Sequence, residues 1–322
     1  TNIDSVGLIT ARQGIEVGAR PGVAASISVD GNMIISGITT LGTTSFTADA
    51  TVNSVTVGKG ANSVDGNTAI GQNALDAATT GDVNVAVGKN ALTDLTTGAS
   101  NVAVGKDAGA NITTGSSNTA IGQGSLTTLT TASNNTAVGK DALTANTTGV
   151  SNTAVGDRAL DANTTANYNT AVGGFALTAN TTGTQNTASG YYSLATNTTA
   201  NSNTAYGYNT LGVNSTGSEN TAIGAFALDA NTTASNNTGV GYNALTGNTT
   251  GGSNSSLGTF ALQSSTTGDN NCAFGRSALQ NNSTADNNSA FGKDALKSNT
   301  TGANNTAVGH NALDANTTGG SN

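Results

Sequence analysis

A single 17-residue period runs from Asn67 to Asn322 without an insertion or a deletion. The glycine at the fifth position of each copy recurs at Gly71, Gly88, Gly105, Gly122, Gly139, Gly156 and Gly173, and onward to Gly309. The asparagine four places earlier recurs at Asn67, Asn84, Asn101, Asn118, Asn135 and Asn152, and onward to Asn305. A fixed period of this kind predicts a solenoid whose coils contact only their neighbours. Fifteen coils at about 4.8 Å each would make a rod of roughly 70 Å.

Each copy reads approximately N-T-A-V-G-x-x-A-L-x-A-N-T-T-G-x-x, as in residues 152–168. The N-T-A-V segment predicts a short strand with alternating sides. The glycine after it permits a turn with positive φ, which a side chain would resist. We expect Ala159 and Leu160 to open a second short strand. The N-T-T segment then makes the return turn, since Asn tolerates left-handed backbone.

Two columns are the expected core, namely the branched residue of the strand and the leucine that follows the turn. The branched position holds residues such as Val138, Val155 and Val172, and the leucine position holds Leu143 and Leu160. This leaves the alanine columns without a place inside one coil. We expect them to be buried against another copy of the chain, because small residues allow close backbone approach. The expected assembly is therefore a homotrimer.

The segments before the repeat do not follow its period. Residues 1–52 contain short alternating stretches and an Asp-Gly-Asn turn at 30–32, which predict a β-strand and hairpin segment. Residues 53–66 resemble a shortened leading coil, because Gly58 lies 13 residues before Gly71. The expected organisation is thus an N-terminal β segment (1–52), a shortened coil (53–66) and the solenoid (67–322). The fold class is all-β, a parallel β-solenoid or β-roll that we expect to be left-handed.

Composition excludes several classes of partner. The chain has 10 basic and 18 acidic residues, a net charge of −8, and no clustered basic residues of the kind that nucleic acid requires. No apolar run is long enough for a membrane-spanning helix. A single cysteine, Cys272, rules out an internal disulfide framework. We therefore expect neither a nucleic-acid partner nor membrane insertion.

The repeat resembles the N-T-A-I-G…A-L…N-T-T-G arrays of bacteriophage tail fibres and of related fibre proteins. The leading segments D-S-V-G-L-I-T-A-R-Q-G and S-V-T-V-G-K-G-A-N are similar to those that precede such arrays. The strand is also similar to the N-S-V-A-I-G head repeats of trimeric autotransporter adhesins, although the coil here is longer. These resemblances imply a trimeric fibre, and the adhesin likeness implies a left-handed parallel β-roll.

The ionisable residues do not form an evident catalytic pattern. Glycosidases need two carboxylates a few ångströms apart. Asp161 and Asp229 share one position of the repeat but lie four coils apart, and His310 falls at a variable turn. Cys272 replaces a strand threonine and has no histidine nearby in sequence. We expect no enzyme activity, no metal and no cofactor.

Aromatic residues are the most suggestive surface feature. They occupy the two positions after the repeat glycine, at Phe175, Tyr191, Tyr192, Tyr208, Phe226, Tyr242 and Phe260. An aromatic stripe among Asn and Thr predicts contact with a host-surface glycan or protein. The competing interpretation is that these rings stack on each other to seal a corner or pack between subunits. A third idea, an ice-binding Thr-Thr column such as Thr147 and Thr148, is weaker because adjacent threonines alternate direction.

These observations predict the shaft of a phage tail fibre or similar virion appendage, a structural protein that supports adhesion and host attachment. The expected partner is the chain itself, as a homotrimer or fibre. The expected location is the virion tail fibre or an extracellular surface. The alternative is a bacterial surface adhesin or a self-assembling extracellular filament.

Overall fold

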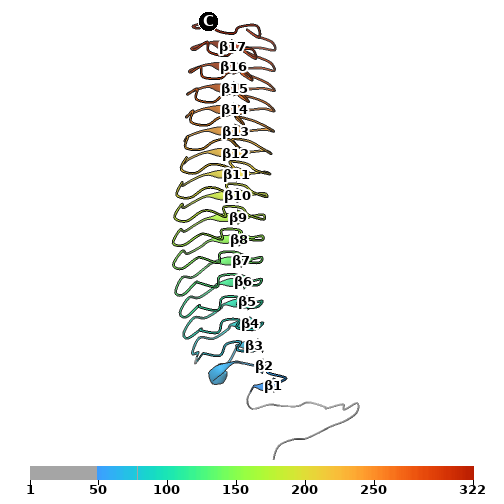
Figure 1. The fold of residues 1–322 in the computed structure, drawn as a ribbon, viewed down its shortest axis with the longest axis vertical. Helices are drawn as coiled ribbons and strands as arrows, with labels where there is room; N and C mark the ends of the chain where they lie inside the picture. Colours follow the sequence, from blue (N-terminus) through green and yellow to red (C-terminus); the bar gives the residue numbers. More distant parts are fainter. Residues whose placement is uncertain (1–48, 78) are drawn as a thin grey trace, which may run out of the picture. The chain divides into compact units, whose positions relative to one another are not determined.

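The computed structural model describes residues 49–77 and 79–322, which belong to one compact unit. The hairpin expected at residues 30–32 lies outside the described residues, as does most of the 1–52 segment. Three elements precede the repeats: β1 (Ala50–Val52), β2 (Val55–Gly58) and a short 3₁₀ turn, η1 (Ala61–Ser63). One strand then follows in each coil, as Figure 1 shows.

The repeat strands are β3 (Thr68–Gly71), β4 (Val85–Val87), β5 (Val102–Val104), β6 (Thr119–Ile121), β7 (Thr136–Val138), β8 (Thr153–Val155), β9 (Thr170–Val172), β10 (Thr187–Ser189), β11 (Thr204–Tyr206), β12 (Thr221–Ile223), β13 (Thr238–Val240), β14 (Ser255–Leu257), β15 (Cys272–Phe274), β16 (Ser289–Phe291) and β17 (Thr306–Val308).

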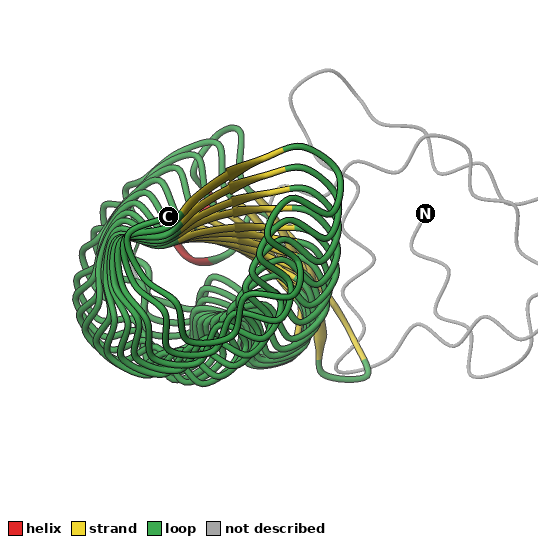
Figure 2. Ribbon diagram, turned by 90° about the horizontal axis from the view of Figure 1, so that it is seen from above, coloured by secondary structure: helices red, strands yellow, loops and turns green. Residues whose placement is uncertain are grey.

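All repeat strands pair in parallel with an unbroken 17-residue register. Thr153 of β8 pairs with Thr170 of β9, and the same match holds from β3 to β17. Seen along the axis, the strands lie over one another on one side of the coils (Figure 2). The predicted all-β parallel solenoid is therefore confirmed. The handedness stays a prediction.

The segment before β3 differs from the expected shortened coil. β1 and β2 form an antiparallel hairpin, and β2 pairs antiparallel to β3, with Thr56 opposite Gly71. Asn53 and Ser54 join the hairpin with φ of 49° and 65°. Two consecutive positive φ values match a type I′ turn, which suits the twist of two-residue hairpins. Because β2 runs opposite to the repeat strands, this segment does not continue the winding of the solenoid.

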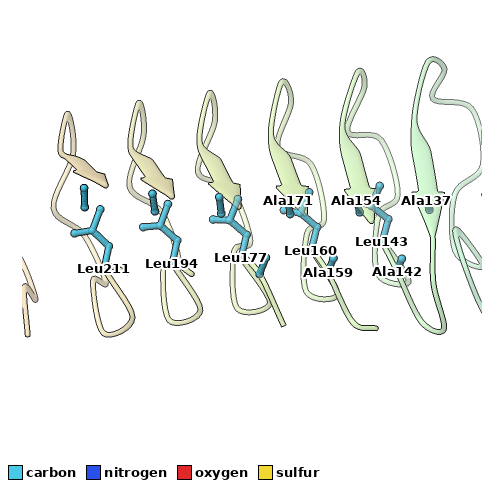
Figure 3. Packing of buried hydrophobic residues seen from close by; sticks show 14 of the residues in the cluster. Ala137, Ala142, Leu143, Ala154, Ala159, Leu160, Ala171, Leu177, Leu194 and Leu211 are labelled. Atoms are coloured by element: carbon cyan, nitrogen blue, oxygen red, sulfur yellow. The ribbon is translucent and has the colours of Figure 1, made fainter. Parts of the chain in front are cut away.

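The core is also different from the one expected. Each strand has a buried centre and more exposed ends, so Ala154 is inside while Thr153 and Val155 face out. The interior contains the alanine columns and the leucines, which point toward each other in Figure 3. Only a small residue fits there: Gly239 takes this place in β13 and Ser256 in β14, and a Cβ on Gly239 would lie only 3.3 Å from Leu228.

This arrangement overturns two expectations. The branched column is a surface feature, with Val172 and Ile223 each 40% exposed. The alanine columns are buried inside the same chain rather than against another one: Ala137, Ala142, Ala154 and Ala159 are fully buried. They consequently offer no support for a trimer.

The second strand expected at Ala159–Leu160 is a turn instead. Leu160 has φ of 52°, and the other leucines of this column have similar values. Left-handed backbone costs a residue with a side chain roughly 1–2 kcal/mol. The cost is offset because this leucine side chain is fully buried in the core.

Hydrogen bonds between coils continue beyond the strands. Leu160 N–H donates to the Ala176 carbonyl at 3.0 Å, and Arg158 N–H donates to the Lys140 carbonyl at 3.0 Å. Ala162 N–H likewise donates to the Thr178 carbonyl at 3.0 Å. The turns therefore repeat as strictly as the strands, and each coil is hydrogen-bonded to the next through both.

Two buried asparagine columns complete the interior. In the first, Asn152 N–H donates to Asn135 Oδ1 at 3.0 Å, and Asn152 Nδ2 donates to the Ala166 carbonyl at 2.8 Å. In the second, Asn163 Nδ2 donates to Asn146 Oδ1 at 3.0 Å. The second column belongs to the N-T-T segments, where we expected left-handed turn residues. Their role lies instead in side-chain hydrogen bonds that satisfy buried backbone groups.

Candidate functional site: an aromatic ladder at one corner

The aromatic residues predicted from the sequence meet in space. They occupy the two positions that follow each repeat glycine, which we call the corner positions. All seven form one continuous stack, which we call the aromatic ladder: Phe175, Tyr191, Tyr192, Tyr208, Phe226, Tyr242 and Phe260. The ladder spans six successive coils, with at least one ring in each.

Ring geometry follows from the coil spacing. Phe226 and Tyr242 meet edge to face with centroids 6.2 Å apart, and Tyr242 and Phe260 do the same at 5.7 Å. Phe175, Phe226 and Phe260 use the second corner position, whereas Tyr208 and Tyr242 use the first. Rings that share a position are stacked instead, as Phe175 and Tyr192 are with centroids 5.2 Å apart and Tyr191 and Tyr208 at 6.0 Å. Alternating positions gives most pairs the preferred edge-to-face contact.

The ladder remains open to solvent on its outer side. Tyr191, Tyr208 and Tyr242 are 46%, 51% and 47% exposed. The three phenylalanines are half-buried behind them. Desolvation by the surrounding groups and the nearby Tyr192 hydroxyl raise the pKa of Tyr191, so its hydroxyl stays protonated near neutral pH.

Charged corners bound the ladder at both ends. On the N-terminal side, Lys140 and Asp141 form an ion pair at 3.2 Å, and the Arg158 guanidinium lies 5.8 Å from the Phe175 ring centre. On the C-terminal side, Lys293 pairs with Asp294 at 2.7 Å. Arg276 occupies the first corner after the ladder, and no corner position of the six ladder coils carries a charge. The ladder is therefore a limited apolar patch within a charged edge.

Sequence reasoning missed a second exposed column, the outward branched residues of the strands. We call it the strand-face column. It includes Ile121, Val172, Tyr206, Ile223, Leu257, Phe274 and Phe291, each at least about a third exposed. Phe274 and Phe291 stack with centroids 5.4 Å apart. The strict alternation of N-T-A-V indicated that the strand has two sides. The expected core, however, contained the branched residue, whereas the structure buries the alanine.

The repeat glycines and the first asparagine column are structural parts of every coil. Gly156 has φ of 137°, and a Cβ there would lie 2.5 Å from the Gly173 carbonyl oxygen. The equivalent contact recurs from Gly71 to Gly292. Glycine is thus needed at this turn for both its φ and its closeness to the next coil.

The other candidate groups do not gather into one centre. Partial burial raises the pKa of Asp161 above its usual 3.8, against the opposing charge of Arg158. Burial also raises the pKa of Asp229, which accepts a hydrogen bond from Thr246. Burial raises the pKa of Cys272, which disfavours a thiolate. Within residues 49–77 and 79–322, no three His, Cys, Asp or Glu side chains are placed to hold a metal ion.

The Thr-Thr column is partly occupied by internal bonds. Thr147 Oγ1 donates to the Thr164 carbonyl at 3.0 Å, and Thr181 Oγ1 donates to the Thr198 carbonyl at 3.0 Å. The first threonine of each of these pairs therefore serves coil stacking, which weakens the idea of a regular ice-binding face.

In the part of the chain that the structure describes, no helix has the length and apolar character to cross a membrane. No protein-family model matches the chain, and no curated protein or solved structure shows significant similarity to it. What can be stated of its family is that it is a β-solenoid protein with a 17-residue repeat.

Proposed function

We propose that the solenoid is the shaft of a phage tail fibre or a similar virion appendage, and that it supports attachment to a host surface. The observation that carries this proposal is the unbroken parallel register from β3 to β17. A rod built by adding identical coils spans distance without a globular core. The resemblance of the repeat to tail-fibre arrays supports the choice of a virion.

The shaft is proposed to be a homotrimer, although its buried alanines give no reason for one. Support comes instead from the strand-face column, which exposes apolar side chains along the sheet. A strip about 10 Å wide and 70 Å long offers roughly 700 Å² per chain, to be shared between its two neighbours in a trimer. Exposed apolar surface of this extent is typical of protein contacts.

Immunoelectron microscopy tests the location. Antibodies against residues 67–322 are expected to label the appendages of intact virions in a lysate of the producing cells. Labelling of the cell surface alone would favour the alternative, a bacterial adhesin. Labelling of free extracellular threads would favour a self-assembling filament, and labelling of none of these would contradict all three roles.

A further inference from the structure

We propose that the aromatic ladder binds a linear, uncharged glycan chain that lies parallel to the solenoid axis. The ladder offers one or two rings per coil over six coils, a length of roughly 24 Å. This inference rests on the proposed attachment role for its biological use, and it names the class of ligand that the shaft would contact.

Core burial does not require the ladder. The coil that carries Lys106 and Asp107 at its corner keeps Ala103 and Ala108 fully buried. The coil that carries Tyr208 and Asn209 keeps Ala205 and Leu211 buried to the same degree. Because a charged corner closes the interior as well as an aromatic one, the rings are not needed to seal it. Their partial exposure to solvent therefore calls for another explanation.

The shape of the ladder favours a repeating ligand. Its rings recur once per coil along a straight edge, with neighbouring centroids 5.2 to 6.2 Å apart between coils. A pyranose ring presents an apolar C–H face, and such faces stack on aromatic rings. Successive sugars of an extended chain can therefore meet successive rings. A non-repeating protein partner would gain nothing from this periodicity.

The chemistry around the rings favours a neutral ligand. The corner positions not filled by rings hold Gly174, Asn209, Ala225, Asn243 and Thr259. The amides and the hydroxyl can exchange hydrogen bonds with sugar hydroxyls. No cation stands in these positions to attract an acidic polysaccharide. The nearest cations stand at the two ends of the strip: Arg158, whose guanidinium lies 5.8 Å from the Phe175 ring centre, and Arg276.

Intrinsic tyrosine fluorescence gives a direct measurement. The chain has no tryptophan, and four of its six tyrosines belong to the ladder, at positions 191, 192, 208 and 242. The purified full chain is titrated with cellohexaose, mannohexaose, maltohexaose and chitohexaose. A hyaluronan hexasaccharide is the acidic comparison. We expect saturable quenching by at least one neutral chain and none by hyaluronan.

Variants then locate the binding. The double variant Tyr208→Ala/Tyr242→Ala is expected to weaken the affinity at least about tenfold, because two stacking faces are lost. Tyr168→Ala is the matched control: Tyr168 is 62% exposed but lies outside the ladder. Tyr208→Phe keeps the ring and should retain most of the affinity. Circular dichroism and thermal unfolding confirm that each variant is folded.

Three results would overturn the inference. The first is that no neutral chain binds the wild type, and the second is that the double variant binds as well as Tyr168→Ala. The third is a change in solution mass of the double variant, which would make the ladder a contact between subunits. If virions are labelled but no glycan binds, the shaft role stands and this inference fails. If a glycan binds but no virion is labelled, the glycan inference stands and the shaft role fails.

Discussion

The second asparagine column contains one break, and repairing it should stabilise the protein. The column runs through Asn214, Asn231 and Asn248, and then Ser265 takes the place of the next asparagine. Asn231 Oδ1 accepts a hydrogen bond from Asn248 Nδ2 at 2.9 Å, but Asn248 Oδ1 has no partner. Ser265 Oγ is buried and unpartnered as well. A serine is too short to reach across one coil.

The variant Ser265→Asn should complete the column. Backbone geometry at this position matches its neighbours: Ser265 N–H donates to the Leu262 carbonyl at 3.2 Å, as Asn248 N–H donates to the Leu245 carbonyl at 3.1 Å. The new amide would donate to Asn248 Oδ1 and to the Gly268 carbonyl, and accept from Asn282. Leaving a buried acceptor unsatisfied costs about 1–3 kcal/mol. After the loss of side-chain entropy, we expect a gain of about 1–2 kcal/mol.

Hydrogen exchange of native amides is the suitable assay, because solenoids open locally as well as globally. Protection should rise in the coils around residues 248–282 and little elsewhere. Two variants serve as controls. Ser265→Ala removes one unsatisfied hydroxyl but leaves Asn248 Oδ1 without a partner, so it should change stability by less than about 1 kcal/mol. Asn214→Ser creates a second break and should lower protection locally. The reasoning would be refuted if Ser265→Asn had no effect or destabilised the chain while Asn214→Ser was neutral.

Three further predictions follow from individual contacts. Gly156→Ala should destabilise the fold by about 2–4 kcal/mol in thermal unfolding, because it adds a clash with the Gly173 carbonyl to the strain of positive φ. Gly309→Ala also places a side chain at positive φ but meets no atom within 4 Å. An equal loss of stability in Gly309→Ala would contradict the role given to the clash. Ser193→Ala should be neutral or stabilise the protein by up to about 1 kcal/mol in the same assay, because Ser193 Oγ is buried without a partner. A loss of stability of more than about 1 kcal/mol would show that this hydroxyl has a hydrogen-bond partner. Asp161→Asn should remove a decline in stability with rising pH: burial raises the folded pKa, so folding favours the protonated form, and stability falls as pH rises from about 3.8 through the raised pKa. Denaturant midpoints across acidic pH check this, and identical pH profiles for variant and wild type would contradict it.

The period alone was enough to predict the architecture. A 17-residue repeat without insertions demands that Thr153 lie beside Thr170 and that each strand run parallel to the next. The aromatic positions also followed from the period, because rings at equivalent places in successive coils must meet. Both predictions depend only on register, which the sequence displays directly.

The content of the interior could not be obtained in the same way. N-T-A-V has two sides, and hydrophobicity favours placing valine inside. The leucines leave room there only for a small residue, since even a Cβ on Gly239 would lie 3.3 Å from Leu228. The asparagine beside the alanine is satisfied by bonds to residues 14 and 17 positions away in sequence. Such partners are visible only once the coils are stacked. The left-handed leucines were missed for the same reason, since burial in the finished core is what offsets their backbone cost.

We propose that the solenoid works as a multi-chain shaft, with copies joined through the strand-face column. Multi-angle light scattering of the full chain measures whether the copies associate in solution. We expect a solution mass about three times the 31.2 kDa of one chain. A stable monomer would contradict the claim and leave the exposed column without its proposed partner.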